Sequence, residues 1–248
     1  MDKVLLITGA GRGIGAATAK LAAQQGWMVA VNYTANSLAA DEVVRIIRAS
    51  GGHAIAIRAD VADEAQVMAM FQHIDAKLGP LAGLVNNAGV VDASQSVAEQ
   101  SVARWRRMFD INVIGSMLCA REAVRRMSTL YGGAGGSIVN VSSAAARLGS
   151  PNEYVDYAAS KAAIDTFTIG LAKETAGGGI RVNAVRPGLI DTEIHASGGK
   201  PNRVDDLKHQ IPMKRGGTAE EVAQTIVWLL SDAASYTTMS LIDVSGAR

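Results

Sequence analysis

Tyr157 and Lys161 stand four residues apart in the stretch Tyr157-Ala158-Ala159-Ser160-Lys161. Residues at this spacing share one face of an α-helix, so the phenol and the amine are expected to point the same way. An ammonium group beside a phenol stabilises the phenolate and lowers the pKa of the phenol. The pair therefore predicts a general acid/base in which Tyr157 carries the proton. Similar pairs occur on ordinary helix surfaces, so the prediction needs support from other motifs.

A glycine-rich turn near the start of the chain gives a second chemical signal. Thr8-Gly9-Ala10-Gly11-Arg12-Gly13-Ile14-Gly15 follows the apolar run Val4-Leu5-Leu6-Ile7 and precedes a helical pattern. Without Cβ atoms the main chain can approach a pyrophosphate, and the helix N-terminus supplies free N–H groups. The alternative is a purely structural turn, but the position between strand and helix favours a dinucleotide site. The residues of this turn that we expect to contact the dinucleotide are Gly9, Gly11, Arg12, Gly13, Ile14 and Gly15.

The residues after the second expected strand indicate which dinucleotide fits. NAD sites place a carboxylate there for the ribose 2′-hydroxyl, whereas NADP sites avoid the acid and supply a cation. Asn32, Tyr33 and Thr34 occupy this place, and no carboxylate follows until Asp41. Arg12 lies in the glycine turn, close to where a 2′-phosphate would bind. We therefore expect NADP, with NAD possible because Asn32 and Tyr33 could hydrogen-bond a free ribose.

Strand-like and helix-like segments alternate along the whole chain. This alternation is typical of βαβ units that form a parallel sheet covered by helices. The sequence therefore predicts an α/β fold, a single-domain Rossmann-type doubly wound parallel β-sheet with helices on both faces, over residues 1–248. The expected strands are 4–7, 28–31, 53–59, 81–86, 137–141, 180–185 and 241–244, and the expected helices are 14–25, 38–49, 64–78, 102–130, 155–175 and 219–230.

Residues 190–212 interrupt this alternation. The segment contains Gly198-Gly199, Pro201, Pro212 and many polar residues between two regular elements. A long irregular insertion in a compact domain is usually a lid or binding loop, so we expect a substrate lid here. A disordered surface loop is the alternative.

Composition excludes several classes of function. The chain has 24 basic and 23 acidic residues, a formal charge of +1, which predicts neither a nucleic acid nor a membrane partner. Cys119 is the only cysteine, and the four histidines lack metal-ligand spacing, so no metal is expected. No signal segment is visible, which favours a cytoplasmic protein. Arg104, Arg106 and Arg107 are interpreted as a solvated helix face. Arg147, Glu153 and His195 are expected near the substrate entrance.

The motifs together resemble the short-chain dehydrogenase/reductase family over nearly the whole chain. Each motif is modestly specific, but their common order on the expected elements is very specific. The matching positions are Thr8, Gly9, Gly13, Gly15, Asp60-Val61, Asn86-Asn87-Ala88-Gly89, Asn112, Ser142-Ser143, Tyr157, Lys161 and Arg186-Pro187-Gly188.

The resemblance implies four catalytic residues. Tyr157 would protonate a carbonyl oxygen or deprotonate an alcohol, and Lys161 would lower its pKa and hydrogen-bond the nicotinamide ribose. Ser143 would donate a hydrogen bond to the substrate oxygen. Ser142 is adjacent, and only the family pattern selects Ser143. Asn112 would hold a water molecule in a proton relay from Lys161.

The same resemblance assigns further contacts to the cofactor and implies an assembly. Asp60 and Val61 would meet the adenine, and the segment Asn87-Ala88-Gly89 would lie on the adenosine side. Residues after the sixth strand would hold the carboxamide and phosphates, namely Pro187, Gly188, Ile190 and Thr192. Relatives are commonly homo-oligomers, so a tetramer or dimer that pairs the helices 102–130 and 155–175 is expected.

The resemblance predicts an NAD(P)-dependent oxidoreductase that moves hydride between a nicotinamide and a small-molecule substrate, an alcohol or carbonyl compound. A 3-oxoacyl-[acyl-carrier-protein] reductase is an alternative, and a non-catalytic nucleotide-binding sensor is a further one. Two departures stand out. The interval from Ser143 to Tyr157 is one residue longer than the commonest family spacing, and Met239 replaces a usual glycine before the last strand.

Overall fold

The computed structural model describes residues 3–248. Residues 1 and 2 of the predicted domain lie outside the described residues. Seven parallel strands form one sheet in the order β3-β2-β1-β4-β5-β6-β7. The strands are β1 (Lys3–Ile7), β2 (Trp27–Tyr33), β3 (Ala54–Arg58), β4 (Leu81–Asn86), β5 (Gly136–Val141), β6 (Ile180–Pro187) and β7 (Leu241–Val244).

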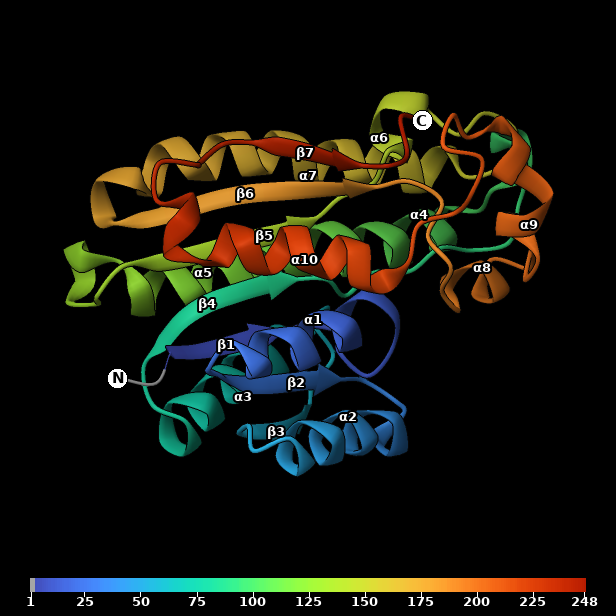
Figure 1. Ribbon diagram of the computed structural model, residues 1–248. Coiled ribbons are helices and arrows are strands. Elements are labelled where there is room, and N and C mark those ends of the chain that lie inside the picture. The colour runs from blue at the N-terminus through green and yellow to red at the C-terminus, as the bar shows by residue number, and fades with distance from the viewer. Residues whose placement is uncertain (1–2) are drawn as a thin grey trace.

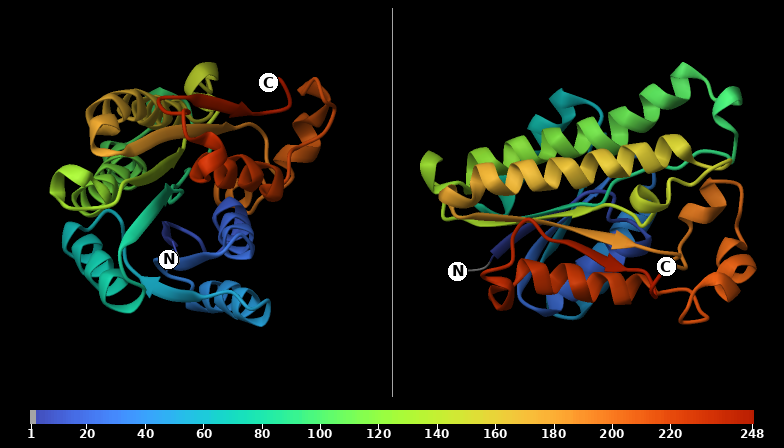
Figure 2. Two further views of the ribbon diagram at one scale, coloured as in Figure 1. Left: turned by 60° about the vertical axis from the view of Figure 1, so that its left-hand side comes forward. Right: turned by 90° about the horizontal axis from the view of Figure 1, so that it is seen from above.

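The sheet carries helices on both faces (Figures 1 and 2), which confirms the predicted fold class. The longer helices are α1 (Gly13–Gln24), α2 (Ser37–Ala49), α3 (Glu64–Lys77), α4 (Val102–Phe109), α5 (Gly115–Met127), α7 (Val155–Thr175) and α10 (Ala219–Leu230). The shorter ones are α6 (Ala145–Leu148), α8 (Ile194–Ser197), α9 (Arg203–Leu207), η1 (Val97–Glu99), η2 (Asp110–Ile114), η3 (Thr129–Tyr131), η4 (Ala176–Gly178), η5 (Lys208–Gln210) and η6 (Asp232–Ala234).

The apolar run of β1 shows how the two faces are filled. Leu5 and Ile7 point into a core shared with α1, α2 and α10, while Val4 and Leu6 point into a core shared with α3 and α5. Successive side chains of a strand face opposite sides, so a strand buried on both faces needs an uninterrupted apolar run. All four side chains have no exposed surface.

The long helical stretch expected over residues 102–130 is present, but it contains a π-helical turn that was not predicted. The structure divides it into α4, the π-helical turn η2 and α5, with η3 after them. A π-helical turn holds one residue more than a regular turn and often occurs at functional sites. The side chain of Asn112 projects from this turn and is 1% exposed.

The carboxyl ends of the strands meet at one edge of the sheet, where α6, α8 and α9 gather (Figure 1). Strand order reverses between β1 and β4, because β2 and β3 lie on one side and β5 to β7 on the other. Crevices at such a reversal are the usual ligand sites of open α/β sheets. The segment predicted as irregular, residues 190–212, contains α8, α9 and η5 at this same edge.

Candidate active site

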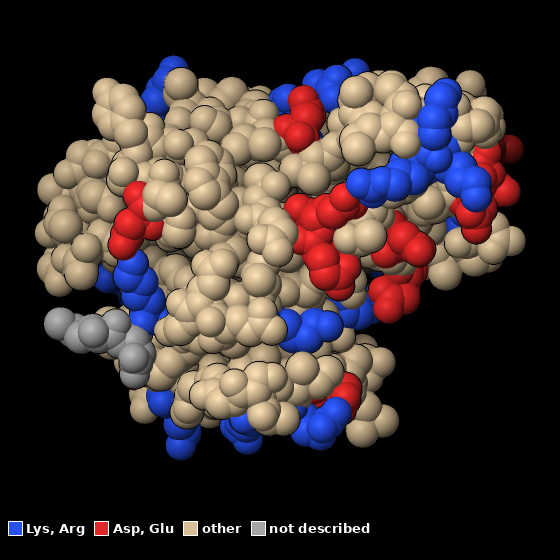
Figure 3. All heavy atoms as spheres, in the orientation of Figure 1, with Lys and Arg blue, Asp and Glu red and all other residues tan. Residues whose placement is uncertain are grey.

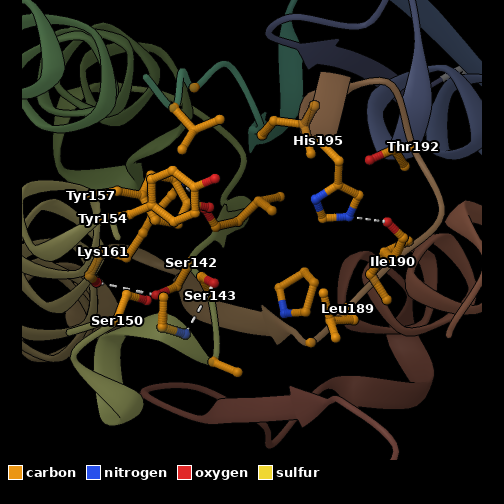
Figure 4. Close-up of a pocket in the computed structure, with 18 of the residues that line it drawn as sticks. Ser142, Ser143, Ser150, Tyr154, Tyr157, Lys161, Leu189, Ile190, Thr192 and His195 are labelled. Carbon is orange, nitrogen blue, oxygen red and sulfur yellow. Dashed lines mark hydrogen bonds between the residues drawn. The ribbon is translucent and has the colours of Figure 1, made fainter. Parts of the chain in front are cut away.

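A pocket opens at this edge between two walls (Figure 4). One wall carries Ser142, Ser143, Tyr154, Tyr157 and Lys161, from the end of β5 and the first turns of α7. The other wall carries Leu189, Ile190, Thr192 and His195, from the segment after β6. The structure therefore brings together the predicted catalytic serine, tyrosine and lysine.

Tyr157 and Ser143 form the polar centre of the first wall. Desolvation of the enclosed phenol raises the pKa of Tyr157, and a hydrogen bond with Ser143 opposes that rise. The neighbouring Ser142 hydroxyl is buried and donates to the main-chain oxygen of Lys161 at 3.1 Å. Ser142 thus ties β5 to α7, and this geometry supports Ser143 as the substrate-facing serine.

Lys161 lies one helical turn beyond Tyr157 and is 4% exposed. Its Nζ donates to the Val141 carbonyl at 2.8 Å and stands 5.7 Å from the centroid of the Tyr157 ring. Burial lowers the pKa of Lys161 to about 8, with an opposing contribution from Asp165. In the protein alone, desolvation of the phenol dominates and the pKa of Tyr157 is raised, so the expected lowering of this pKa by Lys161 stays a prediction.

Asn112 fixes the segment that follows β4. Its side chain accepts from the Val90 N–H at 2.8 Å and donates to the Val90 carbonyl at 3.0 Å and to Ser160 Oγ at 3.1 Å. A Cβ on Gly89 would lie 3.4 Å from both Asn112 Oδ1 and Lys161 Nζ. Asn112 therefore clamps this segment against α7, directly beside the lysine.

The glycine turn is shaped by two asparagines. Asn32 Oδ1 accepts from the Gly9 N–H at 3.1 Å, and Asn32 Nδ2 donates to the Ala59 carbonyl at 3.0 Å. Asn87 Nδ2 donates to the carbonyl oxygens of Thr8 and Gly9 at 2.9 and 3.0 Å. Asn32 is 1% exposed, so it acts from behind the turn rather than at its surface.

Close packing explains why the turn needs glycine. Gly9 has φ +61°, and a Cβ there would lie 3.0 Å from Ala88 Cα. A Cβ on Gly15 would lie 2.5 Å from Asn87 Nδ2 and 2.8 Å from the Gly9 carbonyl oxygen. The N-terminus of α1 consequently presents main-chain N–H groups at the sheet edge without side chains in front of them.

The remaining predicted cofactor residues divide into two groups. Ile14, Asn87, Gly89, Pro187, Gly188, Ile190 and Thr192 line the pocket itself. The others lie outside the pocket lining, in the glycine turn and at the ends of β2, β3 and β4, namely Gly11, Arg12, Gly13, Tyr33, Thr34, Asp60, Val61 and Ala88. Val61 is buried against Gly115, and Asp60 accepts from the Ala62 N–H at 3.0 Å.

Sequence reasoning missed Arg58, the last residue of β3. Its Nε donates to the Thr34 carbonyl at 3.2 Å, and its side chain is exposed. The register pairs Arg58 with Tyr33 of β2, so the guanidinium lies beside the residues expected to meet the cofactor ribose. The sequence does place a basic residue at the end of the third expected strand. The direction in which its side chain points depends on the strand register, which the sequence does not give.

The structure corrects the interpretation of Arg104. This residue is not solvated: its guanidinium is buried and binds Asp156 through two hydrogen bonds, at 2.7 and 3.1 Å. Arg106 and Arg107 are exposed, as expected. The Arg104–Asp156 ion pair joins α4 to the first turn of α7, next to Tyr157, and so positions the catalytic helix.

The three residues expected at the substrate entrance have different surroundings. His195 lines the pocket, and its Nε2 lies 2.8 Å from the Ile190 carbonyl. Burial lowers the pKa of His195, and the nearby Arg203 contributes to that shift. Glu153 binds Lys200 and Arg203. Arg147 pairs with Asp243 at 3.2 Å.

Residues 3–248 contain no group of three or more His, Cys, Asp or Glu side chains able to hold a metal ion. No helix in this part of the chain has the length and apolar character required to cross a bilayer. On the face drawn in Figure 3, basic and acidic side chains are interspersed.

Comparisons with known proteins find relatives that match nearly the whole chain. A family model described as "Enoyl-(Acyl carrier protein) reductase" matches residues 9–246. The uncharacterized oxidoreductase YgfF of Escherichia coli (strain K12) is 59% identical over 245 residues, 99% of each chain. The cis-4-hydroxycyclohexanecarboxylate dehydrogenase of Sinomonas cyclohexanicum is 40% identical over 245 residues, covering 99% of this chain and 96% of that protein.

Solved structures give the same result. The crystal structure of a short-chain type dehydrogenase/reductase from Mycobacterium marinum matches with a TM-score of 0.92 and 36% identity, covering 98% of this chain and 94% of that one. The resemblance inferred from the motifs is thereby confirmed. The chain belongs to the short-chain dehydrogenase/reductase family, and it is an NAD(P)-dependent oxidoreductase that acts on alcohol or carbonyl groups.

Proposed function

We propose that this oxidoreductase uses NADP and reduces the carbonyl group of a small molecule, with Tyr157 as proton donor. The observation that carries the proposal is the pairing of Ser143 with Tyr157 inside the pocket, one helical turn from the buried Lys161. These groups face the crevice at which the strand order reverses.

The residues present fit a nicotinamide dinucleotide. The glycine turn keeps Cβ atoms away from the N-terminus of α1, as the contacts of Gly9 and Gly15 require. Helix N-termini of this kind bind phosphate groups. Ile14 and Asn87 would contact the phosphates and the adenosine side of the cofactor, while Ile190 and Thr192 would hold its carboxamide end. When bound, the nicotinamide ring supplies the hydride that the protein residues cannot provide.

The side chains of the protein supply the proton and stabilise the charges that form during its transfer. Ser143 donates a hydrogen bond to the substrate oxygen, which stabilises the negative charge that develops there. The Tyr157 phenol then gives its proton to this oxygen, so hydride and proton together convert C=O to CH–OH. The Lys161 ammonium, helped by the positive charge of an oxidised nicotinamide, lowers the cost of the phenolate left behind. Asn112 keeps the segment after β4 against Lys161, where we place the predicted water relay.

Two cations support the choice of NADP. Arg12 is exposed in the glycine turn, and its guanidinium has no hydrogen-bond or ion-pair partner within residues 3–248. Arg58 lies beside Thr34, where a 2′-phosphate would bind. No carboxylate occupies residues 32–36. A 2′-phosphate placed between these guanidinium groups would receive charge-assisted hydrogen bonds.

We also propose a lid and a homo-oligomer. Residues 190–212 would act as the substrate lid, because His195 and Arg203 of this segment line the pocket. Subunits would pair through α4, η2, α5 and α7. The support is a set of exposed apolar side chains on these elements, namely Val102, Trp105, Phe109, Ile114, Met117 and Val155. Sedimentation of the purified protein tests the assembly.

The function is tested by following NADPH and NADH oxidation with a panel of ketones, aldehydes and acetoacetyl thioesters. The panel should include cyclic oxo acids, since the Sinomonas relative is named for a hydroxycyclohexanecarboxylate. Tyr157→Phe should lower kcat about 1,000-fold while cofactor affinity changes less than about 3-fold, because only the proton donor is lost. Tyr131→Phe, at an exposed phenol, is the control.

The outcomes separate the alternatives. Turnover restricted to acetoacetyl thioesters would assign a carrier-protein reductase instead. Cofactor binding without turnover of any compound in the panel would support a nucleotide sensor. Retention of full activity in Tyr157→Phe would remove the assigned mechanism, and a clear preference for NADH would remove the NADP assignment.

A further inference from the structure

The charged side chains that line the pocket are all basic. Lys161, Arg203 and Arg248 contribute to the lining of the pocket, and no Asp or Glu of the described residues does so. Lys161 donates a hydrogen bond to the Val141 carbonyl and belongs to the proposed catalytic centre. The two arginines have no assigned role in proton or hydride transfer. A pocket lined by cations without carboxylates attracts anions.

Arg203 is fixed in place by neighbouring groups. Its guanidinium binds both oxygens of Glu153 and stands 5.2 Å from the centroid of the Tyr154 ring. Glu153 also accepts a hydrogen bond from Lys200. Two cations therefore share one carboxylate, and this cluster retains a net positive charge beside the pocket.

Arg248 differs from Arg203 because its guanidinium has no hydrogen-bond or ion-pair partner among residues 3–248. Its main-chain oxygen, by contrast, is held by Arg147 at 2.8 Å and by Ser245 Oγ at 3.1 Å. Burial and the nearby charge of Arg203 lower the pKa of Arg248, and the Glu153 carboxylate partly opposes this shift. A half-buried charge next to a like charge is costly unless an anion compensates it.

Both arginines lie on the substrate side of the pocket rather than at the phosphate site. Arg147, which holds the Arg248 main chain, belongs to α6, two residues after the start of that helix and four after Ser143. Tyr154, which packs on Arg203, lies beside Tyr157 on the same wall (Figure 4). The glycine turn follows β1, which β4 separates from β5 in the sheet.

Apolar side chains line the same pocket as these charges and the catalytic groups. Leu148, Leu189 and Ile194 line the pocket together with Ser143 and Tyr157. A ligand that reaches from Tyr157 to the arginines would place an apolar body against these side chains.

We propose that the substrate is an oxo or hydroxy acid whose carboxylate binds Arg248, with Arg203 as its second cation, while its reacting oxygen meets Ser143 and Tyr157. The inference rests on the proposed function and specifies its substrate class. The arginines hold the carboxylate and position the carbonyl carbon; they take no part in bond making.

The test uses matched ligands that differ only in charge. 4-Oxocyclohexanecarboxylate and 4-oxocyclohexanecarboxamide are compared as substrates of the NADPH-saturated enzyme. A charge-assisted contact with arginine predicts a kcat/KM about 10- to 100-fold higher for the acid. Arg248→Gln should remove most of this preference by raising KM for the acid alone, and Arg248→Lys should restore part of it. Arg125→Gln, an exposed residue of α5, is the matched control.

A second measurement is independent of turnover. Calorimetry with the NADP-loaded protein compares cyclohexanecarboxylate with cyclohexanecarboxamide, and the acid should bind about 10-fold tighter or more. Equal binding of the two ligands, or an acid preference that survives Arg248→Gln, overturns the inference. A preference of the same size for acetoacetyl thioesters of phosphopantetheine, lost in Arg248→Gln, would also overturn it by assigning the arginines to a phosphate.

The failure of this inference is distinguishable from the failure of the proposed function. If neutral ketones are reduced and Tyr157→Phe is inactive, the enzyme assignment stands whatever the acid preference. If acids bind through Arg248 but nothing is reduced, the anion site stands and the proposed reaction fails. The unfolding midpoint of Arg248→Gln, expected within about 2 °C of wild type for a partly exposed side chain, verifies that the variant folds.

Discussion

The two ends of the pocket are held by different kinds of interaction. At the nucleotide end, which comprises the glycine turn and the ends of β2 and β3, neutral hydrogen bonds from Asn32 and Asn87 fix main-chain groups. At the substrate end, which comprises α6, the first turn of α7, the proposed lid and Arg248, charged side chains meet across long stretches of sequence. Arg104 binds Asp156 there, and Glu153 binds Arg203.

This difference has a physical origin. A dinucleotide contacts the main chain at the nucleotide end, so the protein needs close approach and correct main-chain direction, which glycines and short amides provide. Under the proposed function, the substrate end must hold residues 190–212 and a small ligand. Long ionic side chains are suited to this, because they bridge gaps between elements that do not share hydrogen-bonded strands.

The largest expected effect comes from the buried ion pair of the substrate end. Asp156→Asn would leave the Arg104 guanidinium, 6% exposed, without its counter-charge. Loss of one partner of a buried pair typically lowers the free energy of unfolding by about 3–5 kcal/mol. Asp92→Asn, in the exposed pair with Arg107 at 3.3 Å, should cost less than about 1 kcal/mol. Denaturant unfolding of both variants gives the comparison.

Equal losses in the two variants would show that the substrate end does not depend on its buried charges. A loss confined to Asp156→Asn should also reduce kcat, since the pair lies next to Tyr157 at the start of α7. The kcat of Asp92→Asn should remain near that of wild type.

The fold and the nucleotide end could be predicted from sequence because their determinants are local. The apolar run of β1 predicts a strand buried on both faces, and the glycine spacing predicts the turn that follows it. The fold class, the family and the oxidoreductase activity were predicted correctly on this basis. The π-helical turn at Asn112 was not predicted, because it inserts one residue while the helix continues on both sides.

The substrate end was less predictable because its determinants lie far apart in the chain. Arg104 was interpreted as solvated, since a run of three arginines among four residues suggests a surface and its partner lies 52 positions away. The directions of Arg58 and Arg248 depend on strand register and on the path of the final residues. The raised pKa of Tyr157 depends on the depth of the pocket, which spacing alone does not encode.

The nucleotide end can be tested with a pair of glycine variants. Gly15→Ala would place a Cβ 2.5 Å from Asn87 Nδ2 and 2.9 Å from Ala10 Cα. Overpacking of this kind costs about 1–3 kcal/mol, so NADPH should bind about 10- to 100-fold more weakly. Gly11→Ala is the control, because its Cβ would find no atom nearer than 3.5 Å. Fluorescence titration with NADPH measures both, and equal affinities would refute the close-packing explanation.

The buried amine of Lys161 predicts a pH-dependent stability at the catalytic wall. Its pKa falls from 10.5 to about 8 on folding, so the unfolded chain binds more protons between these pH values. Folding stability must then rise with pH in this window, by about 2 kcal/mol from pH 7.5 to 9.5 relative to Lys161→Met. The raised pKa of Tyr157 acts oppositely, but only above pH 10, where free phenols ionise. Parallel stability curves for wild type and variant would contradict the burial of a charged amine.

The smallest effect concerns a position outside both ends of the pocket. Met239 adopts φ +65°, a left-handed conformation that favours glycine, and its side chain is 43% exposed. Met239→Gly should therefore raise the free energy of unfolding by up to about 1 kcal/mol, because relief of backbone strain exceeds the lost contacts. Met68 of α3 has a similar exposure of 41%, yet Met68→Gly should lower stability by about 1 kcal/mol, since glycine disfavours a helix. Chemical denaturation should give opposite signs for the same substitution, and the same sign would show that the left-handed backbone at Met239 carries no strain.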